Sequence, residues 1–211
     1  MLEISWSKAL EFLEHYEIPT NSTRIFLLPS FYVETLKWKM KWKNLKGIFL
    51  PRFLRGYVFF SPDFSEIEEA YVHELSHGSF FENFPIGREI QRLDREVYEL
   101  EKELFQGEVE NIFVKVSSDV KGSRKVGTNV YEVNKEEFEK YIAVSKKLDS
   151  LHKRFLPLIE SFAILVSEEF LKRKMEVPLS YFPVYEMLRR KGLKEIISYL
   201  YALAPDERIY I

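Results

Sequence analysis

Residues 65–81, which read SEIEEAYVHELSHGSFF, are the most strongly patterned stretch of the chain. Ser65 is followed three residues later by Glu68, an arrangement that is typical of a capping box at the start of a helix. Pro85 lies shortly after the stretch, and a proline disfavours the helical conformation of the residue that precedes it. The sequence therefore predicts a helix that begins near Ser65 and ends near Asn83.

This predicted helix contains an HExxH motif, His73-Glu74-Leu75-Ser76-His77. Residues four positions apart lie about one turn apart on the same helix face, so both imidazoles can bind one metal ion. Glu74 is rotated by about 100° from His73, so its carboxylate flanks the metal and can take a proton from a metal-bound water. We therefore expect His73 and His77 to bind Zn²⁺ and Glu74 to act as the general base.

A catalytic zinc site needs a third protein ligand and keeps a fourth position open for water. The chain has no cysteine, so the third ligand must be a histidine or a carboxylate. Glu160 lies in an otherwise apolar stretch, LIESFAILV at residues 158–166, where a buried carboxylate is costly unless it is paired or binds a metal. Other acidic candidates lie mostly on charge-rich helix faces: Glu82, Asp94, Glu96, Glu99, Glu103, Glu168 and Glu169.

Together, the two segments resemble the gluzincin group of zinc metallopeptidases. In that group HExxH supplies two zinc ligands and a glutamate on a later helix supplies the third, often within a stretch such as NEGFA. Residues 160–163, ESFA, are similar to EGFA with Ser161 in place of glycine. The resemblance implies a zincin-like fold, hydrolysis of peptide bonds in a peptide or protein substrate, and Glu160 as the third ligand beside His73 and His77.

The chain departs from the gluzincin pattern in two places. Many members place the third ligand closer to the motif, and their spacing leads here to Glu96, which is the alternative third ligand. We favour Glu160 because Glu96 belongs to a charged helix that carries many carboxylates. Ile164 occupies the position of the acid that usually follows the third ligand, so Glu168 or Asp63 would have to orient an imidazole instead.

A peptidase also needs a hydrogen-bond donor that stabilises the transition state. Tyr181, Tyr185 and His152 are the candidates for this role, and Tyr199 and Tyr201 are further possibilities. Because the chain has twelve tyrosines, ordinary packing is the simpler explanation for each of them taken singly.

Short apolar runs before the motif predict a small sheet. The runs at 24–28, 48–50 and 56–60 read as strands, and the alternation of KWKMKWK within 31–46 predicts another. Apolar residues at helical spacing predict an amphipathic helix over residues 3–17. We expect an α+β fold in which a small mixed sheet of three to five strands packs on the HExxH helix.

A long segment between the motif and Glu160 reads as an insertion. Helical patterns at 88–106 and 135–154 flank a hairpin-like pattern at 109–134. We therefore predict a helix-hairpin-helix insertion over 88–150. The predicted catalytic core consists of 1–87 and 151–211.

The remaining boundaries follow from capping residues and proline. Asn134 is expected to cap the second helix of the insertion, and Pro157 to start or kink a further helix over 157–174. Two short helices are predicted within 180–203, and the tail at 207–211 is a candidate edge strand.

Composition restricts the environment and the partners of the chain. The net charge of −2 argues against a dedicated nucleic-acid binder, and we weigh the KWKMKWK stretch as a strand rather than as a nucleic-acid or membrane surface. No apolar run approaches the roughly 18 residues of a membrane span, and the first residues lack the pattern of a signal peptide. We expect a cytoplasmic location, and the excess of Glu and Lys is typical of proteins from hot environments.

One alternative from another functional class stays open. The chain could be a non-catalytic helical interaction protein that uses segment 88–150 to bind a partner, whereas in an enzyme the same segment is a candidate for a lid or for contact with a second copy of the chain. The HExxH motif would then be inert or would bind a structural metal. Zinc content of the purified protein distinguishes the two hypotheses.

Overall fold

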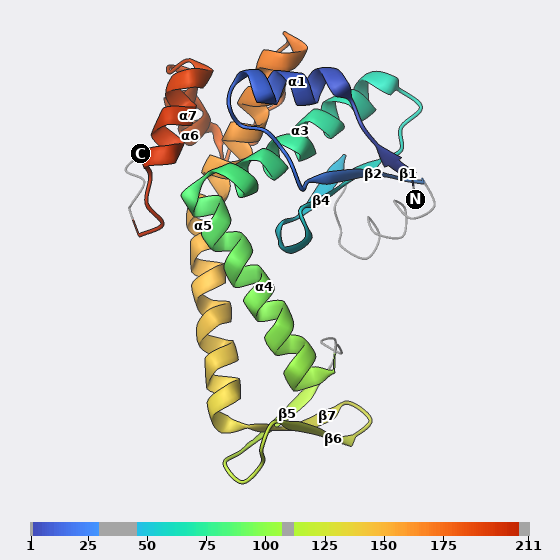
Figure 1. Cartoon of the computed structure of the whole chain (residues 1–211), viewed down its shortest axis with the longest axis vertical. Coiled ribbons are helices and arrows are strands. Elements are labelled where there is room, and N and C mark those ends of the chain that lie inside the picture. Colours follow the sequence, from blue (N-terminus) through green and yellow to red (C-terminus); the bar gives the residue numbers. More distant parts are fainter. Residues whose placement is uncertain (1, 30–45, 107–111, 207–211) are drawn as a thin grey trace. The chain divides into compact units, whose positions relative to one another are not determined.

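The computed structural model describes residues 2–29, 46–106 and 112–206 (Figure 1). They form two compact units, Met1–Glu89 with Arg154–Ile211 and, separately, Ile90–Lys153. Both units combine helices with a small sheet, so the expected α+β class is confirmed. The predicted strand at 31–46 and the predicted edge strand at 207–211 lie, but for Lys46, outside the described residues.

The sheet of the first unit has four strands in the order β1-β2-β4-β3. The apolar runs predicted as strands are confirmed as β2 (Arg24–Leu28), β3 (Gly47–Leu50) and β4 (Arg55–Phe59). Strand β2 pairs in parallel with β4, whereas β1 pairs antiparallel with β2 and β3 pairs antiparallel with β4. The sheet is therefore mixed and has the predicted number of strands within the described part of the chain.

The N-terminal prediction is wrong for its first residues. Strand β1 (Leu2–Ile4) precedes helix α1 (Ser7–His15), whereas the sequence predicted one helix from residue 3 onward. The register places Leu2 opposite Leu27 and Ile4 opposite Ile25. Pairing with a strand distant in sequence thus outweighs the helical spacing of the apolar residues.

The HExxH motif lies in helix α3 (Phe64–Asn83), which ends where the sequence predicted. The expected cap is wrong, because the helix begins one residue earlier and Asp63 is its N-cap. The Oδ1 atom of Asp63 accepts a hydrogen bond from the backbone N–H of Ser65 at 2.8 Å. Ser65 is thus already inside the first turn, and its backbone N–H donates to the cap instead of its side chain forming the cap.

The C-terminal half of α3 holds the loop that leads into β2. The carboxylate of Glu82 accepts hydrogen bonds from the backbone N–H groups of Asn21, Ser22 and Thr23 and from the Thr23 hydroxyl. Gly78 allows this loop to approach, since a Cβ atom there would collide with Thr23. Glu82 therefore has a structural role.

Two glycines of the sheet let α3 lie close to β3 and β4. A Cβ atom on Gly56 would stand 2.9 Å from Glu74 Cβ and 2.5 Å from Ile25 Cδ1. A Cβ atom on Gly47 would collide with the Glu74 carboxylate. The sheet thus has a recess at these two glycines, and the Glu74 side chain fills it.

Helix α5 (Lys135–Leu171) is continuous over 37 residues with Pro157 inside it, so the prediction that a separate helix starts at Pro157 is wrong. Proline removes one helical hydrogen bond, but Phe155 and Leu158 beside it are fully buried, and their packing offsets that loss. Among the described residues, no helix is both long enough and hydrophobic enough to cross a lipid bilayer. The two short helices predicted after α5 are confirmed as α6 (Phe182–Arg189) and α7 (Leu193–Ala202).

The second unit contains a three-stranded sheet, so the predicted simple hairpin is wrong. Strands β5 (Phe113–Ser117), β6 (Ser123–Gly127) and β7 (Val130–Asn134) are ordered β5-β7-β6. Strands β6 and β7 form an antiparallel hairpin, and β5 pairs in parallel with β7. The sequence SRKVG of β6 is mostly polar and gave no strand signal.

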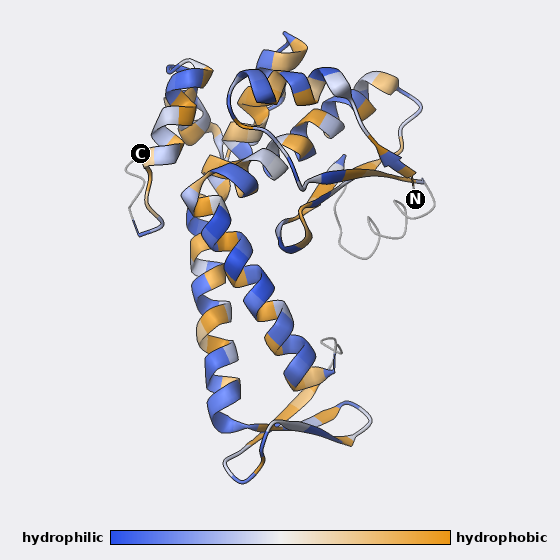
Figure 2. Ribbon diagram, in the orientation of Figure 1, coloured by the Kyte–Doolittle hydropathy of each residue, from blue (hydrophilic) through white to orange (hydrophobic). Residues whose placement is uncertain are grey.

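Helix α4 (Pro85–Phe105) carries hydrophobic residues among hydrophilic ones along its length (Figure 2). Its apolar positions in the second unit are buried: Ile90, Leu93, Val97, Leu100 and Leu104. Leu104 and Phe105 form a small core with Tyr131 and Val133 of β7. Asn134 caps α5 as predicted, because its Oδ1 accepts from the backbone N–H groups of the first turn at 2.9 and 3.2 Å.

Filling the recess in the sheet should destabilise the first unit. Gly56→Val places two methyl groups against Ile25 and Glu74, and overpacking of this kind costs about 1–3 kcal/mol. Chemical denaturation monitored by circular dichroism measures the loss. The matched control is Gly192→Ala, since a Cβ atom at Gly192 meets nothing within 4 Å. Equal stability of the two variants would contradict the close packing of α3 on the sheet.

Candidate metal centre

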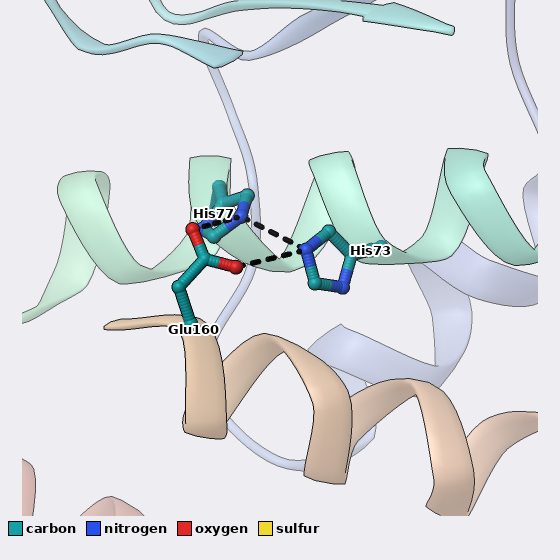
Figure 3. Close-up of side chains that lie close together, drawn as sticks. All are labelled: His73, His77 and Glu160. Carbon is teal, nitrogen blue, oxygen red and sulfur yellow. Dashed lines mark hydrogen bonds and ion pairs between the residues drawn. The ribbon is translucent and has the colours of Figure 1, made fainter. Parts of the chain in front are cut away.

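His73 and His77 of α3 face Glu160 of α5 (Figure 3). The two Nε2 atoms are 3.1 Å apart, and Glu160 lies 3.4 Å from His73 Nε2 and 3.6 Å from His77 Nε2 through its two carboxylate oxygens. One ligand atom from each residue lies within 4.8 Å of the others. The structure thus brings together the three residues that the sequence singled out as metal ligands.

The cluster lies at the wall of a cleft of about 470 Å³. His77 is almost buried at 7% side-chain exposure, whereas His73 and Glu160 are 21% and 24% exposed. Besides His73 and Glu160, the cleft is lined by Lys46, Gly47, Glu69, Ala70, Glu74, Ile164, Met175, Glu176 and Pro178. Solvent and a small ligand can therefore reach the cluster from one side.

The donor set fits zinc. Two imidazole nitrogens and one carboxylate make a set that catalytic zinc sites use, with a fourth position left for water. Within the ranges that the structure describes, no other group of three or more such side chains comes together in this way. Negative charge surrounds His73: burial opposes its protonation, but the hydrogen bond to Glu160 and the charges of Glu74, Glu160 and Glu69 raise its pKa.

Glu74 points into the protein beside the cluster. The residue is only 4% exposed, and its Oε2 atom is buried without a hydrogen-bond partner among the described residues. Burial raises the pKa of Glu74 to about 8; His73 opposes this shift and the negative charge of Glu160 adds to it. An orphaned carboxylate oxygen next to two imidazoles and a second carboxylate is the environment that a bound cation would stabilise.

The alternative third ligand, Glu96, has other partners. Its carboxylate lies 3.0 Å from Arg92 Nη1 and 4.0 Å from Lys140 Nζ, both within the second unit. Glu96 does not belong to the cluster that forms around the two histidines.

Among the candidates for transition-state stabilisation, Tyr181 interacts electrostatically with Glu160 of the cluster. Burial and the negative charge of Glu160 raise the pKa of the Tyr181 hydroxyl, so this residue lies within the electric field of the third ligand. His152 is an exposed residue of the second unit.

Tyr185 serves a different purpose. Its hydroxyl donates to the Glu168 carboxylate at 2.8 Å, and burial together with this bond raises the Tyr185 pKa to about 12. Glu168 also accepts from the backbone N–H of Met175 at 2.9 Å. Glu168 and Asp63, the acids that the sequence suggested for orienting an imidazole, thus have other partners: Glu168 binds Tyr185 and Met175, and Asp63 caps α3.

One ionic group beside the site was not predicted. Glu69 lies one helical turn before His73, and its two oxygens bind Lys46 Nζ at 2.7 Å and Arg173 Nη2 at 3.0 Å. It joins α3 to the start of β3 and to the segment after α5. Its position four residues before His73 places Glu69 on the same helix face, which was the one signal for it in the sequence. Its two cationic partners could not be predicted, because they come from distant segments.

Alanine variants should show whether Glu160 or Glu96 is the third zinc ligand. We expect Glu160→Ala to weaken zinc binding by more than about 100-fold, because a direct ligand contributes at least as much as the groups that support it. Glu96→Ala should retain full zinc, since it loses only exposed ion pairs. Competition with a chelating dye and metal analysis measure both. Full zinc in Glu160→Ala with none in Glu96→Ala would reverse the assignment.

Comparison with known proteins adds nothing to this geometry. No protein-family model, no curated protein and no solved structure matches the chain. The chemistry must therefore be argued from the side chains themselves.

Proposed function

We propose that the first unit is a zincin-like enzyme that hydrolyses peptide bonds with one zinc ion. One observation carries the proposal: His73, His77 and Glu160 converge at the wall of a cleft that the buried carboxylate of Glu74 also lines. This combination of three ligands and one unpaired base is what metal-assisted hydrolysis requires. The likeness of both segments to gluzincins supports the same chemistry.

The roles of the side chains follow from their positions. When bound, zinc supplies a Lewis acid that lowers the pKa of water to about 7 and polarises a carbonyl. Glu74 takes the proton from the attacking water and transfers it to the leaving nitrogen as the C–N bond breaks. Its own pKa of about 8 would fall beside a bound dication, so the base is charged at neutral pH.

The sheet fixes the position of the base. Because Gly47 and Gly56 have no side chains, the Glu74 carboxylate lies in the recess between α3 and the sheet and cannot swing freely. A general base must lie within hydrogen-bond reach of the proton that it removes. Restricting Glu74 in this way lowers the entropic cost of reaching that geometry.

Tyr181 is the proposed hydrogen-bond donor that stabilises the transition state. The charge of Glu160 acts on its hydroxyl. As a hydrogen-bond donor, this hydroxyl can stabilise the carbonyl oxygen of the substrate, which becomes negative as water attacks. Tyr185 donates to Glu168 and is not free for this role.

The cleft is consistent with a peptide or protein substrate. Its volume of about 470 Å³ falls within the range of small-ligand sites, so it holds a side chain and a short stretch of backbone. The competing hypothesis, a non-catalytic interaction protein that uses segment 88–150, predicts no zinc-dependent activity. Stoichiometric zinc in the purified protein together with peptide hydrolysis would exclude it.

Replacing the base should stop turnover without removing the metal. Glu74→Gln preserves the shape of the side chain but cannot accept the proton, so we expect kcat to fall by about 10²–10⁴-fold while zinc content is unchanged. Hydrolysis of a quenched fluorescent peptide library, with metal analysis, measures both. Glu99→Gln, an exposed change in the second unit, is the control. Parental activity in Glu74→Gln would refute the catalytic assignment.

Two tyrosine variants should behave differently. Tyr181→Phe is expected to lower kcat by about 10²–10³-fold with little change in KM, because the donor acts mainly on the transition state. Tyr185→Phe should lower thermal stability instead, since it removes the partly buried hydrogen bond to Glu168. Steady-state kinetics and melting curves of both variants test this. Loss of kcat in Tyr185→Phe alone would transfer the role to Tyr185.

A further inference from the structure

A second cavity of the first unit, of about 410 Å³, lies between the end of α5, the segment that follows it and the loop joining α6 to α7. Its charged lining consists of five cations and two carboxylates: Lys172, Arg173, Lys174, Arg189, Lys191, Glu168 and Glu169. The chain as a whole carries a net charge of −2. Positive charge is therefore concentrated in this cavity against the overall balance of the protein.

The cations are only weakly committed to other partners. Four of them form ion pairs in which at least one side chain is well exposed, and such pairs contribute little to stability. These pairs are Lys172 with Glu169, Arg173 with Glu69, Arg189 with Glu186, and Lys191 with Glu195. Lys174 is exposed and makes no ion pair within the described residues. A ligand can therefore recruit these side chains at small cost.

The two acidic side chains of the lining offset part of this charge. The Glu168 carboxylate is held by neutral donors, the Tyr185 hydroxyl at 2.8 Å and the Met175 N–H at 2.9 Å, so it keeps its negative charge. Glu169 is the partner of Lys172 alone. The lining therefore has more cations than carboxylates, and Arg173, Arg189 and Lys191 have their carboxylate partners, Glu69, Glu186 and Glu195, outside the lining.

We propose that this cavity binds a small phosphate-bearing ligand. A phosphate group has three or more acceptor oxygens and up to two negative charges, so it can satisfy an arginine and several lysines together. A single carboxylate has two oxygens and one charge and would leave most of these donors unmatched. The volume of about 410 Å³ suits a small molecule such as a phosphorylated metabolite.

The phosphate cavity and the metal cleft are lined by neighbouring residues of one chain segment. Residues 172–174 line the phosphate cavity, whereas Met175, Glu176 and Pro178 of the same segment line the cleft beside His73. Arg173 belongs to the cavity and also binds Glu69 of the cleft. Binding at the cavity therefore acts on a segment that the two sites share, and the proposal does not depend on the reaction at the metal.

Isothermal titration of the full chain with inorganic phosphate and with pyrophosphate, at constant ionic strength, tests the proposal. We expect saturable binding at one site, tighter for pyrophosphate. Lys174→Gln and Lys191→Gln should each weaken it by about tenfold or more, because each removes one charge-assisted contact. Lys153→Gln is the matched control, since Lys153 is an exposed lysine in an ion pair with Asp149 of the second unit. Both cavity lysines are surface side chains, and melting curves verify that the variants are folded.

Three results would overturn the proposal. The first is the absence of binding by the parent at millimolar pyrophosphate. The second is an equal loss of affinity in Lys153→Gln and in the two cavity variants, which would show a diffuse charge effect. The third is tighter binding of a single-stranded oligonucleotide than of pyrophosphate, weakened by the same two substitutions. This result would identify a polymer-binding surface.

Discussion

The close contact between α3 and the sheet at Gly47 and Gly56 determines the rest of the first unit. It places Glu74 in a recess that any larger residue in those strands would close. With Glu74 directed into the sheet, the geometry of the helix turns His73 and His77 toward α5. Glu160 of α5 then completes the cluster, so the identity of two strand glycines decides whether base and ligands can share one cleft.

The parts of the site that depend on local periodicity could be predicted from the sequence. HExxH fixes the relative directions of His73, Glu74 and His77 as soon as the segment is helical, and the structure has it in a helix. Glu160 was identified by contrast, as the one carboxylate in an apolar run. Neither inference required knowledge of how distant segments meet. In the structure Glu160 faces the two histidines, whereas Glu96 pairs with Arg92.

The features that were missed depend on contacts between distant residues. Strand β1 exists because Leu2 and Ile4 pair with β2, and the helical spacing of the same residues gives no hint of this. The polar sequence of β6 is a strand because β7 supplies its partners. Helix α5 continues through Pro157 because its flanks are buried. The two cations on Glu69 come from segments before and after the motif that no spacing rule connects.

The distribution of charge in the cleft explains why a dication suits the inner cluster. Two permanent cations lie close to α3, Lys46 in the lining of the cleft and Arg173 in the lining of the second cavity, and both bind the carboxylate of Glu69. Glu160 is paired with two imidazoles, which are positive only when protonated. Burial raises the Glu74 pKa to about 8 in spite of His73, and Glu160 contributes to the rise. The outer carboxylate is thus neutralised by side chains, whereas a bound cation would stabilise the inner pair.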